Sequence, residues 1–264
     1  MQFRTEVTVH KAAWEILPAD RILFVGSCFA DNLGRRFVEN RFRATVNPFG
    51  VMYNPVSILH TAERWEGEAD VSVFTLGTNH VYVLKETGEV VDNCQKRPQR
   101  LFEERELTVD ECVENLARAV QCMMQKGCRH IIVTVSPIRY AKYGYHGSKL
   151  SKATLLLAAD LLAKDYPGTV DYFPAYEIVE DELRDYRFYK EDMLHPSAQA
   201  VEYIWEKFSA AYFGRETAQF LAEWKPIREA LGHKPFNPEA EEYRLFIAKA
   251  REREMAFVEK YHLY

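Results

Sequence analysis

The stretch Arg21–Phe37, RILFVGSCFADNLGRRF, contains the change from strand to helix from which the fold can be worked out. Its first residues form a short apolar run, typical of a buried strand, that ends at Gly26. An amphipathic segment with apolar residues at helical spacing follows at once. Ser27 and Cys28 therefore lie side by side at a predicted strand-to-helix turn, and both are candidate nucleophiles.

Strands and helices alternate along the chain after this stretch. A capping box at Thr108 starts one helix, which has Met124 on its predicted inner face. The helix predicted over 151–166 turns Leu157 and Leu161 inward. The predicted strands are 21–25, 42–46, 71–76, 131–135 and 170–173, with a hairpin over 80–91, and the other helices are 30–39, 55–65 and 197–212.

This alternation predicts an α/β fold. Strand–helix–strand crossovers are right-handed and give a mostly parallel sheet covered by helices on both faces. Functional residues in such sheets gather at the carboxyl ends of the strands. We expect residues 1–214 to form one catalytic domain and residues 215–264 to be a helical extension packed on it. Packing on the domain or a homodimer contact explains the apolar residues of this extension: Phe220, Trp224, Ile227, Tyr243, Phe246 and Ile247.

The composition excludes several functional classes. The chain has 264 residues, of which 47% are hydrophobic, enough for one large domain with a core. A net charge of −5 without a polybasic run disfavours nucleic-acid binding. No stretch has the length of a membrane span, and the N-terminal residues lack a signal-peptide core. We therefore expect a cytoplasmic protein that binds neither nucleic acid nor a membrane.

Neither the cysteines nor the histidines predict a metal site or a cofactor. The five cysteines form no CxxC pair and no even disulfide framework. The histidines are not spaced as metal ligands, and no glycine-rich phosphate loop occurs.

Two stretches supply the partners that a nucleophile needs in acyl chemistry. In EDMLHPS, residues 191–197, Asp192 can orient the ring of His195, which then acts as the base. Asn79, two residues after the glycine that ends a predicted strand, can donate to an oxyanion, as can the Gly50 backbone N–H. Surface residues and plain turns are the alternative interpretations of these patterns.

These residues and their order resemble the GSCFA family of the SGNH/GDSL hydrolase superfamily. The resemblance rests on GSCFA at residues 26–30 and extends over nearly the whole chain. The other matching stretches are NPFGVMYNP, VVDNCQKRP, TVSPIRY, SKATLLLA and YFPAYEIVEDELRDYRFYKEDMLHPS. It implies a three-layer α/β/α sandwich of the SGNH type.

The resemblance also assigns roles to individual residues. Cys28 falls on the nucleophile position, with Ser27 as the alternative, and Asp192 and His195 fall on the final Asp-x-x-His pair. Asn79 falls on the oxyanion asparagine. The full expected set of oxyanion donors is the Cys28 N–H, the Gly50 N–H and the Asn79 amide.

The sequence departs from the family pattern in three places. The nucleophile position holds cysteine instead of serine, Gln95 replaces an expected histidine, and the segment between Pro55 and Val71 is short.

The function implied is hydrolysis of an ester by a Cys/Ser–His–Asp triad. By analogy, an O-acylated carbohydrate or other small-molecule ester is the expected substrate. Asn54, Arg139 and His146 are the candidate substrate-binding residues. An acyltransferase with the same triad, or a carbohydrate-binding protein without activity, are the alternatives.

Overall fold

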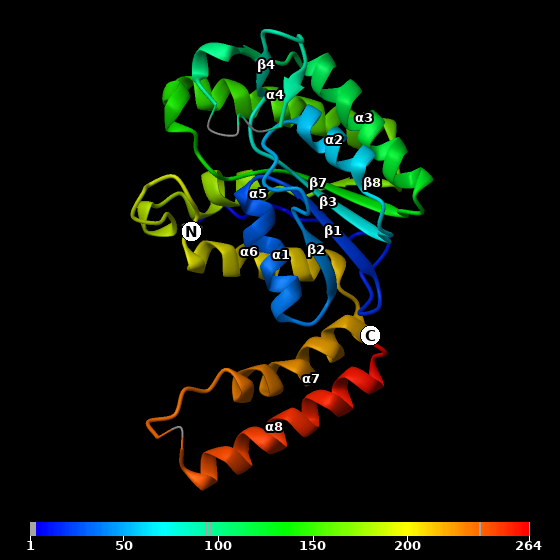
Figure 1. The fold of residues 1–264 in the computed structure, drawn as a ribbon, viewed down its shortest axis with the longest axis vertical. Helices are drawn as coiled ribbons and strands as arrows, with labels where there is room; N and C mark the ends of the chain where they lie inside the picture. Colours follow the sequence, from blue (N-terminus) through cyan, green and yellow to red (C-terminus); the bar gives the residue numbers. More distant parts are fainter. Residues whose placement is uncertain (1–3, 93, 95–96, 238, 264) are drawn as a thin grey trace.

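A five-stranded parallel sheet with the order β2-β1-β3-β7-β8 lies at the centre of the molecule (Figure 1). The computed structural model describes residues 4–92, 94, 97–237 and 239–263, so the Gln95 departure lies outside the described residues. The strands are β1 (Arg21–Gly26), β2 (Arg43–Val46), β3 (Val71–Leu76), β7 (His130–Val135) and β8 (Val170–Tyr172).

Helices cover both faces of this sheet. Figure 1 shows α2, α3 and α4 on one face and α1 and α6 on the other, each group over its own hydrophobic cluster. The predicted α/β/α sandwich is therefore confirmed. The helices are α1 (Cys28–Glu39), α2 (Pro55–Arg64), α3 (Val109–Gln125), α4 (Gly144–Asp165), α5 (Ala175–Glu177), α6 (Ala198–Tyr212), α7 (Arg215–Leu231) and α8 (Glu241–Lys260).

A small antiparallel sheet lies beside the main one. The predicted hairpin is present as β4 (His80–Leu84) and β5 (Val90–Val91), and Gly88 in its turn has a positive φ of 73°. A third strand, β6 (Phe102–Glu106), pairs with β4 and was not predicted. Its sequence, FEERE, has no alternation of apolar and polar residues because four of its five side chains are exposed.

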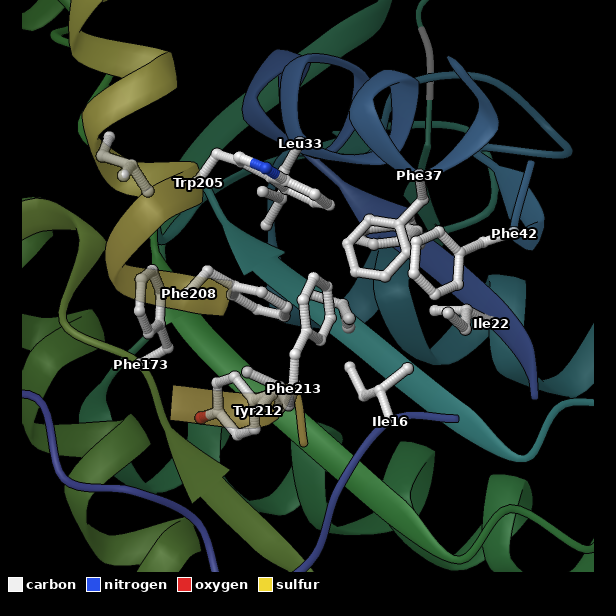
Figure 2. Close-up of a cluster of buried hydrophobic side chains, with 14 of the residues drawn as sticks. Ile16, Ile22, Leu33, Phe37, Phe42, Phe173, Trp205, Phe208, Tyr212 and Phe213 are labelled. Carbon is white, nitrogen blue, oxygen red and sulfur yellow. The ribbon is translucent and has the colours of Figure 1, made fainter. Parts of the chain in front are cut away.

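Aromatic packing joins α1 to α6 (Figure 2). The ring of Phe37 on α1 meets Trp205 and Phe208 of α6 edge-on, with centroids 5.1 Å and 5.8 Å apart. Such pairs contribute about 0.5–1.5 kcal/mol each beyond the area that they bury. This contact fixes the relative position of two helices that begin at Cys28 and just after His195.

The inward face of α4 differs from the prediction. Leu157 and Leu161 are 56% and 41% exposed, and Met124 on α3 is exposed as well. The prediction failed because the buried stripe of α4 consists largely of small and polar residues, which a search for large apolar side chains passes over. That stripe is Ser148, Ser151, Lys152, Leu155, Ala158, Ala159 and Leu162.

The C-terminal helices α7 and α8 pack against each other, and α7 also contacts the rest of the chain. The indole Nε1 of Trp224 donates to the Glu39 carbonyl at 2.8 Å, and the ring of Phe220 lies 5.1 Å from that of Phe42. Phe246, on α8, is exposed. The division of the chain at residue 214 stays a prediction. Among the described residues, no helix is both long and apolar enough to cross a membrane.

The packing of α7 predicts that its core residues stabilise the whole chain. Phe220 is fully buried, so Phe220→Ala should lower the free energy of unfolding by about 3–5 kcal/mol. Phe246→Ala, on the exposed surface, is the control and should change it by about 0.5 kcal/mol or less. Urea unfolding, followed by circular dichroism and tryptophan fluorescence, measures both. A separate early transition of the tail in Phe220→Ala would show that the helices unfold independently.

Candidate active site

The site begins at a turn in which no side chain larger than hydrogen fits. Gly26 has a φ of 143°, and a Cβ there would lie 2.2 Å from the Thr75 carbonyl oxygen of β3. The Ser27 N–H donates to that same oxygen at 3.0 Å. The chain therefore leaves β1 in close contact with β3 and enters α1 at Cys28.

The two candidate nucleophiles have different environments. Ser27 is fully buried, and its Oγ accepts from the Phe29 N–H at 3.2 Å and lies 3.1 Å from Thr75 Oγ1. It is the N-cap of α1, a role that satisfies the hydroxyl inside the protein. Cys28 is half-buried, and its Sγ lies 3.9 Å from the Tyr53 hydroxyl. Only Cys28 is open to a substrate.

The predicted Asp192–His195 pair forms within one loop. Oδ2 of Asp192 lies 2.6 Å from Nδ1 of His195, and Oδ1 accepts the backbone N–H groups of Leu194 and His195 at 2.9 Å. These backbone hydrogen bonds, and then the imidazole, lower the pKa of Asp192 to about 2. Because an ionised carboxylate only accepts hydrogen bonds, Nδ1 carries the proton and Nε2 is left to act as a base.

Arg139 holds this loop at the carboxyl edge of the sheet. Its backbone N–H donates to the Leu194 carbonyl at 3.1 Å and its guanidinium to the Met193 carbonyl at 3.0 Å. His195, in the loop before α6, and Cys28, at the start of α1, therefore belong to the same edge of the sheet. Within the described ranges no hydrogen bond joins His195 to Cys28 or Ser27, and catalytic hydrogen bonds often tighten only when substrate binds.

The structure gives Asn79 and Gly50, the expected oxyanion donors, hydrogen-bond acceptors inside the protein. Asn79 is 2% exposed, and its side-chain amide donates to the Leu107 carbonyl at 2.8 Å. The Gly50 N–H donates to the Asn47 carbonyl at 2.9 Å. Both hydrogen bonds stabilise loop conformations, which fits the alternative interpretation of these stretches as plain turns.

Of the three candidate substrate-binding residues, Arg139 lines a cavity at the carboxyl edge of the sheet. Asn54 is buried and caps α2, with its Oδ1 accepting from the Ser57 N–H at 3.0 Å. His146 lies exposed on α4 and does not line the cavity beside Arg139. That cavity, of about 280 Å³, also contains the rings of Tyr145, Tyr176, Tyr186 and Tyr189.

Sequence reasoning missed a buried lysine behind the site. The ammonium of Lys152 on α4 donates to the carbonyls of Gly77 and Ser136, both at 2.7 Å, and so joins the ends of β3 and β7. The helical spacing of Ser148, Lys152 and Leu155 was the available signal, and the wrong inward face of α4 concealed it. Tyr53, close to Cys28, was also missed because nothing in its local sequence marks it.

The sequence comparisons identify the family. The GSCFA family model matches residues 21–68 and 59–208, and a second model, GSCFA domain protein, C-terminal domain, matches residues 224–262. These matches cover more than half of the chain, which therefore belongs to the GSCFA family. No curated protein matches it in sequence.

Several solved structures are similar to this chain. A catalytic mutant of Axe2, an acetylxylan esterase from Geobacillus stearothermophilus, has a TM-score of 0.50 and 12% identity, over 76% of this chain and 97% of that chain. A carbohydrate esterase family 3 protein from Talaromyces cellulolyticus gives 0.44 and 10%, over 77% and 99%. A member of the lipolytic protein G-D-S-L family from Veillonella parvula gives 0.45 and 13%, over 71% and 94%. At 12% identity, the similarity to the acetylxylan esterase shows the α/β fold alone.

Burial of Lys152 predicts a pH-dependent contribution to stability. Burial lowers the pKa of Lys152 from its ordinary 10.5 to about 7 in the folded protein. Between these values the unfolded chain binds more protons at this residue, so stability rises with pH, and below the folded pKa the cost of the buried charge is present in full. The free energy of unfolding of the wild type should therefore rise relative to Lys152→Met from pH 7 toward about 10.5.

Urea unfolding of both proteins across this pH window measures the difference. Lys149→Met is the matched control, because Lys149 lies one turn earlier on α4 with its ammonium at the surface, paired with Glu180. A difference between wild type and Lys152→Met that stays constant with pH would contradict the lowered pKa.

Proposed function

We propose that this GSCFA protein is an ester hydrolase of the SGNH type, with Cys28 as nucleophile, His195 as base and Asp192 as the group that orients the base. The observation that carries this proposal is the Asp192–His195 contact of 2.6 Å. It fixes the tautomer of the imidazole with Nε2 free to accept a proton, which supports a pairing with Cys28 at the start of α1. The family and the fold support the same activity.

Cys28 is favoured over Ser27 by the contacts of the two side chains. The Ser27 hydroxyl is buried and engaged by Phe29 and Thr75. Cys28 lies in the first turn of α1, where the positive end of the helix dipole stabilises an anion such as a thiolate. Its own N–H is among those that an α-helix leaves without an internal acceptor, so it can donate to an oxyanion.

Acylation and deacylation then follow from these positions. Nε2 of His195 takes the Sγ proton of Cys28, Sγ bonds to the acyl carbon, and the carbonyl electrons move to oxygen. When the intermediate collapses, the ester C–O bond breaks and His195 returns the proton to the departing alcohol. Water next loses a proton to Nε2 and attacks the thioester carbon, the C–S bond breaks, and the thiol regains its proton.

An O-acylated carbohydrate is the proposed substrate. The acetylxylan esterase with the same fold acts on such an ester by its description, and we extend that class to this chain. The cavity supports the extension, because Arg139 lies 4.3 Å from the centroid of Tyr145 and 5.3 Å from that of Tyr189. Aromatic rings beside hydrogen-bond donors suit the apolar faces and hydroxyls of a sugar.

The His195–Asp192 pair predicts a large loss of turnover in two variants. His195→Ala and Asp192→Asn should each lower kcat on an active ester by roughly 100- to 10,000-fold, because the base or its orientation is lost. Asp160→Asn, on the exposed surface of α4 where the carboxylate pairs with Lys164, should stay close to wild type. Initial rates over a panel of acetyl esters measure this, with thermal melts to confirm folding. Equal turnover in His195→Ala would remove the base from the proposal.

The choice of Cys28 predicts selective chemistry at one thiol. Burial raises the pKa of Cys112 to about 12 and also raises the pKa values of Cys94 and Cys128. Iodoacetamide at neutral pH should therefore alkylate Cys28 faster than these three cysteines. It should also alkylate Cys28 faster than Cys122, whose Sγ donates to the Ala62 carbonyl at 3.2 Å, and peptide mass spectrometry would show both differences.

Substitution distinguishes the two nucleophiles directly. Cys28→Ala should abolish turnover, whereas Ser27→Ala should keep most of it and lose about 0.5–2 kcal/mol of stability as a missing N-cap. An active Cys28→Ala with an inactive Ser27→Ala would reverse the assignment. Transfer of the acyl group to an added alcohol in preference to water would make the enzyme an acyltransferase.

A further inference from the structure

The proposed reaction needs more oxyanion donors than the expected set provides. The amide of Asn79 is buried and donates to the Leu107 carbonyl, and the single N–H of Gly50 donates to the Asn47 carbonyl, so the Cys28 N–H is the donor of that set best placed to meet a substrate. An oxyanion in a site that excludes water is stabilised by two or three preorganised donors. The surroundings of Cys28 therefore have to contain other donors.

Tyr53 presents a hydroxyl to the nucleophile. Its Oη lies 3.9 Å from Sγ of Cys28, and the side chain is 40% exposed, so a substrate can reach it. Its backbone is held firmly, because its carbonyl accepts the N–H groups of Gly77 and Thr78 at 2.9 Å and 2.8 Å. The hydroxyl thus projects from a fixed point of the same sheet edge.

Tyr140 presents a second hydroxyl, which has no hydrogen-bond partner in the described part of the chain although it is buried. A Cβ on Gly77 would lie 2.4 Å from this oxygen and 3.4 Å from the Ser27 Cβ, which places the hydroxyl directly behind the nucleophile turn. The rings of Tyr53 and Tyr140 meet edge-on, with centroids 6.3 Å apart. A buried hydroxyl without an acceptor is costly, and a ligand oxygen would relieve that cost.

We propose that the hydroxyls of Tyr53 and Tyr140 donate to the oxyanion that forms when Cys28 attacks the acyl carbon, beside the Cys28 N–H. This inference rests on the proposed function and replaces the donors that Asn79 and Gly50 do not supply. The tyrosines contribute hydrogen bonds only, so no proton leaves them, and Nε2 of His195 remains the sole acceptor of the thiol proton.

The ionisation of both tyrosines agrees with this role. Burial, followed by the nearby Cys28 charge, raises the pKa of Tyr53 to about 12. Burial also raises the pKa of Tyr140 further, with smaller effects from Tyr53 and Cys28. Both hydroxyls therefore keep their protons at neutral pH and can only donate to an anion.

Comparison of two reactions at Cys28 separates oxyanion stabilisation from thiol activation. Acylation by p-nitrophenyl acetate passes through an oxyanion, whereas alkylation by iodoacetamide displaces iodide and forms none. Tyr53→Phe and Tyr140→Phe should each lower the acylation rate constant by roughly 100- to 1000-fold and leave the alkylation rate constant unchanged. Intact-mass spectrometry measures both rate constants on the full chain.

The control is Tyr243→Phe, which removes a hydroxyl on α8 that donates to the His233 carbonyl at 3.1 Å and should change neither rate constant. Equal losses in acylation and alkylation would show that the tyrosines act on the thiolate, and unchanged acylation would show that they do nothing; either result overturns the inference. A wild-type thiol that is alkylated but never acylated would refute the proposed function itself. If Tyr140→Phe does not fold, Tyr53→Phe, at a half-exposed position, decides the question.

Discussion

The contact of β1 with β3 at Gly26 is the constraint on which the rest of the structure depends. The Thr75 carbonyl lies where a Cβ would be, and it accepts the Ser27 N–H at 3.0 Å. The chain can therefore turn from strand into helix without leaving the sheet, which gives α1 its N-cap and brings Cys28 to the carboxyl edge. The loops after β3 and β7 start at fixed positions relative to this turn, because β3 pairs in register with β1 and β7 pairs in register with β3.

Polar contacts tie these loops together. Lys152 joins the carbonyls of Gly77 and Ser136, and Arg139 fastens the loop of the Asp–His pair by two carbonyl contacts. A buried ammonium is expensive unless its protons are used, so Lys152 supports the site only while both carbonyls stay in place. Rigidity at the edge thus depends on hydrogen bonds that reach across elements far apart in sequence.

The sequence predicted the sheet, the helices that cover it and the Asp192–His195 pair, because strand periodicity and a four-residue motif are local properties. It could not predict which hydrogen-bond acceptor inside the protein a buried side-chain amide would find. Whether Asn79 faces a substrate or the Leu107 carbonyl depends on a loop that lies 28 residues away. The predicted inward face of α4 was wrong for a related reason. Its buried side chains include Lys152, which is held there by a hydrogen bond to the Gly77 carbonyl and not by its own hydrophobicity.

The base and its orienting carboxylate are three residues apart, and all of their mutual hydrogen bonds lie within one loop. The two side chains therefore move together with that loop as one unit. A displacement of this loop as a unit would alter the distance from imidazole to thiol without disturbing the tautomer, so motion could switch the nucleophile off while the base stays chemically ready. Enzymes that take these two groups from separate strands lose orientation and distance together when one strand shifts.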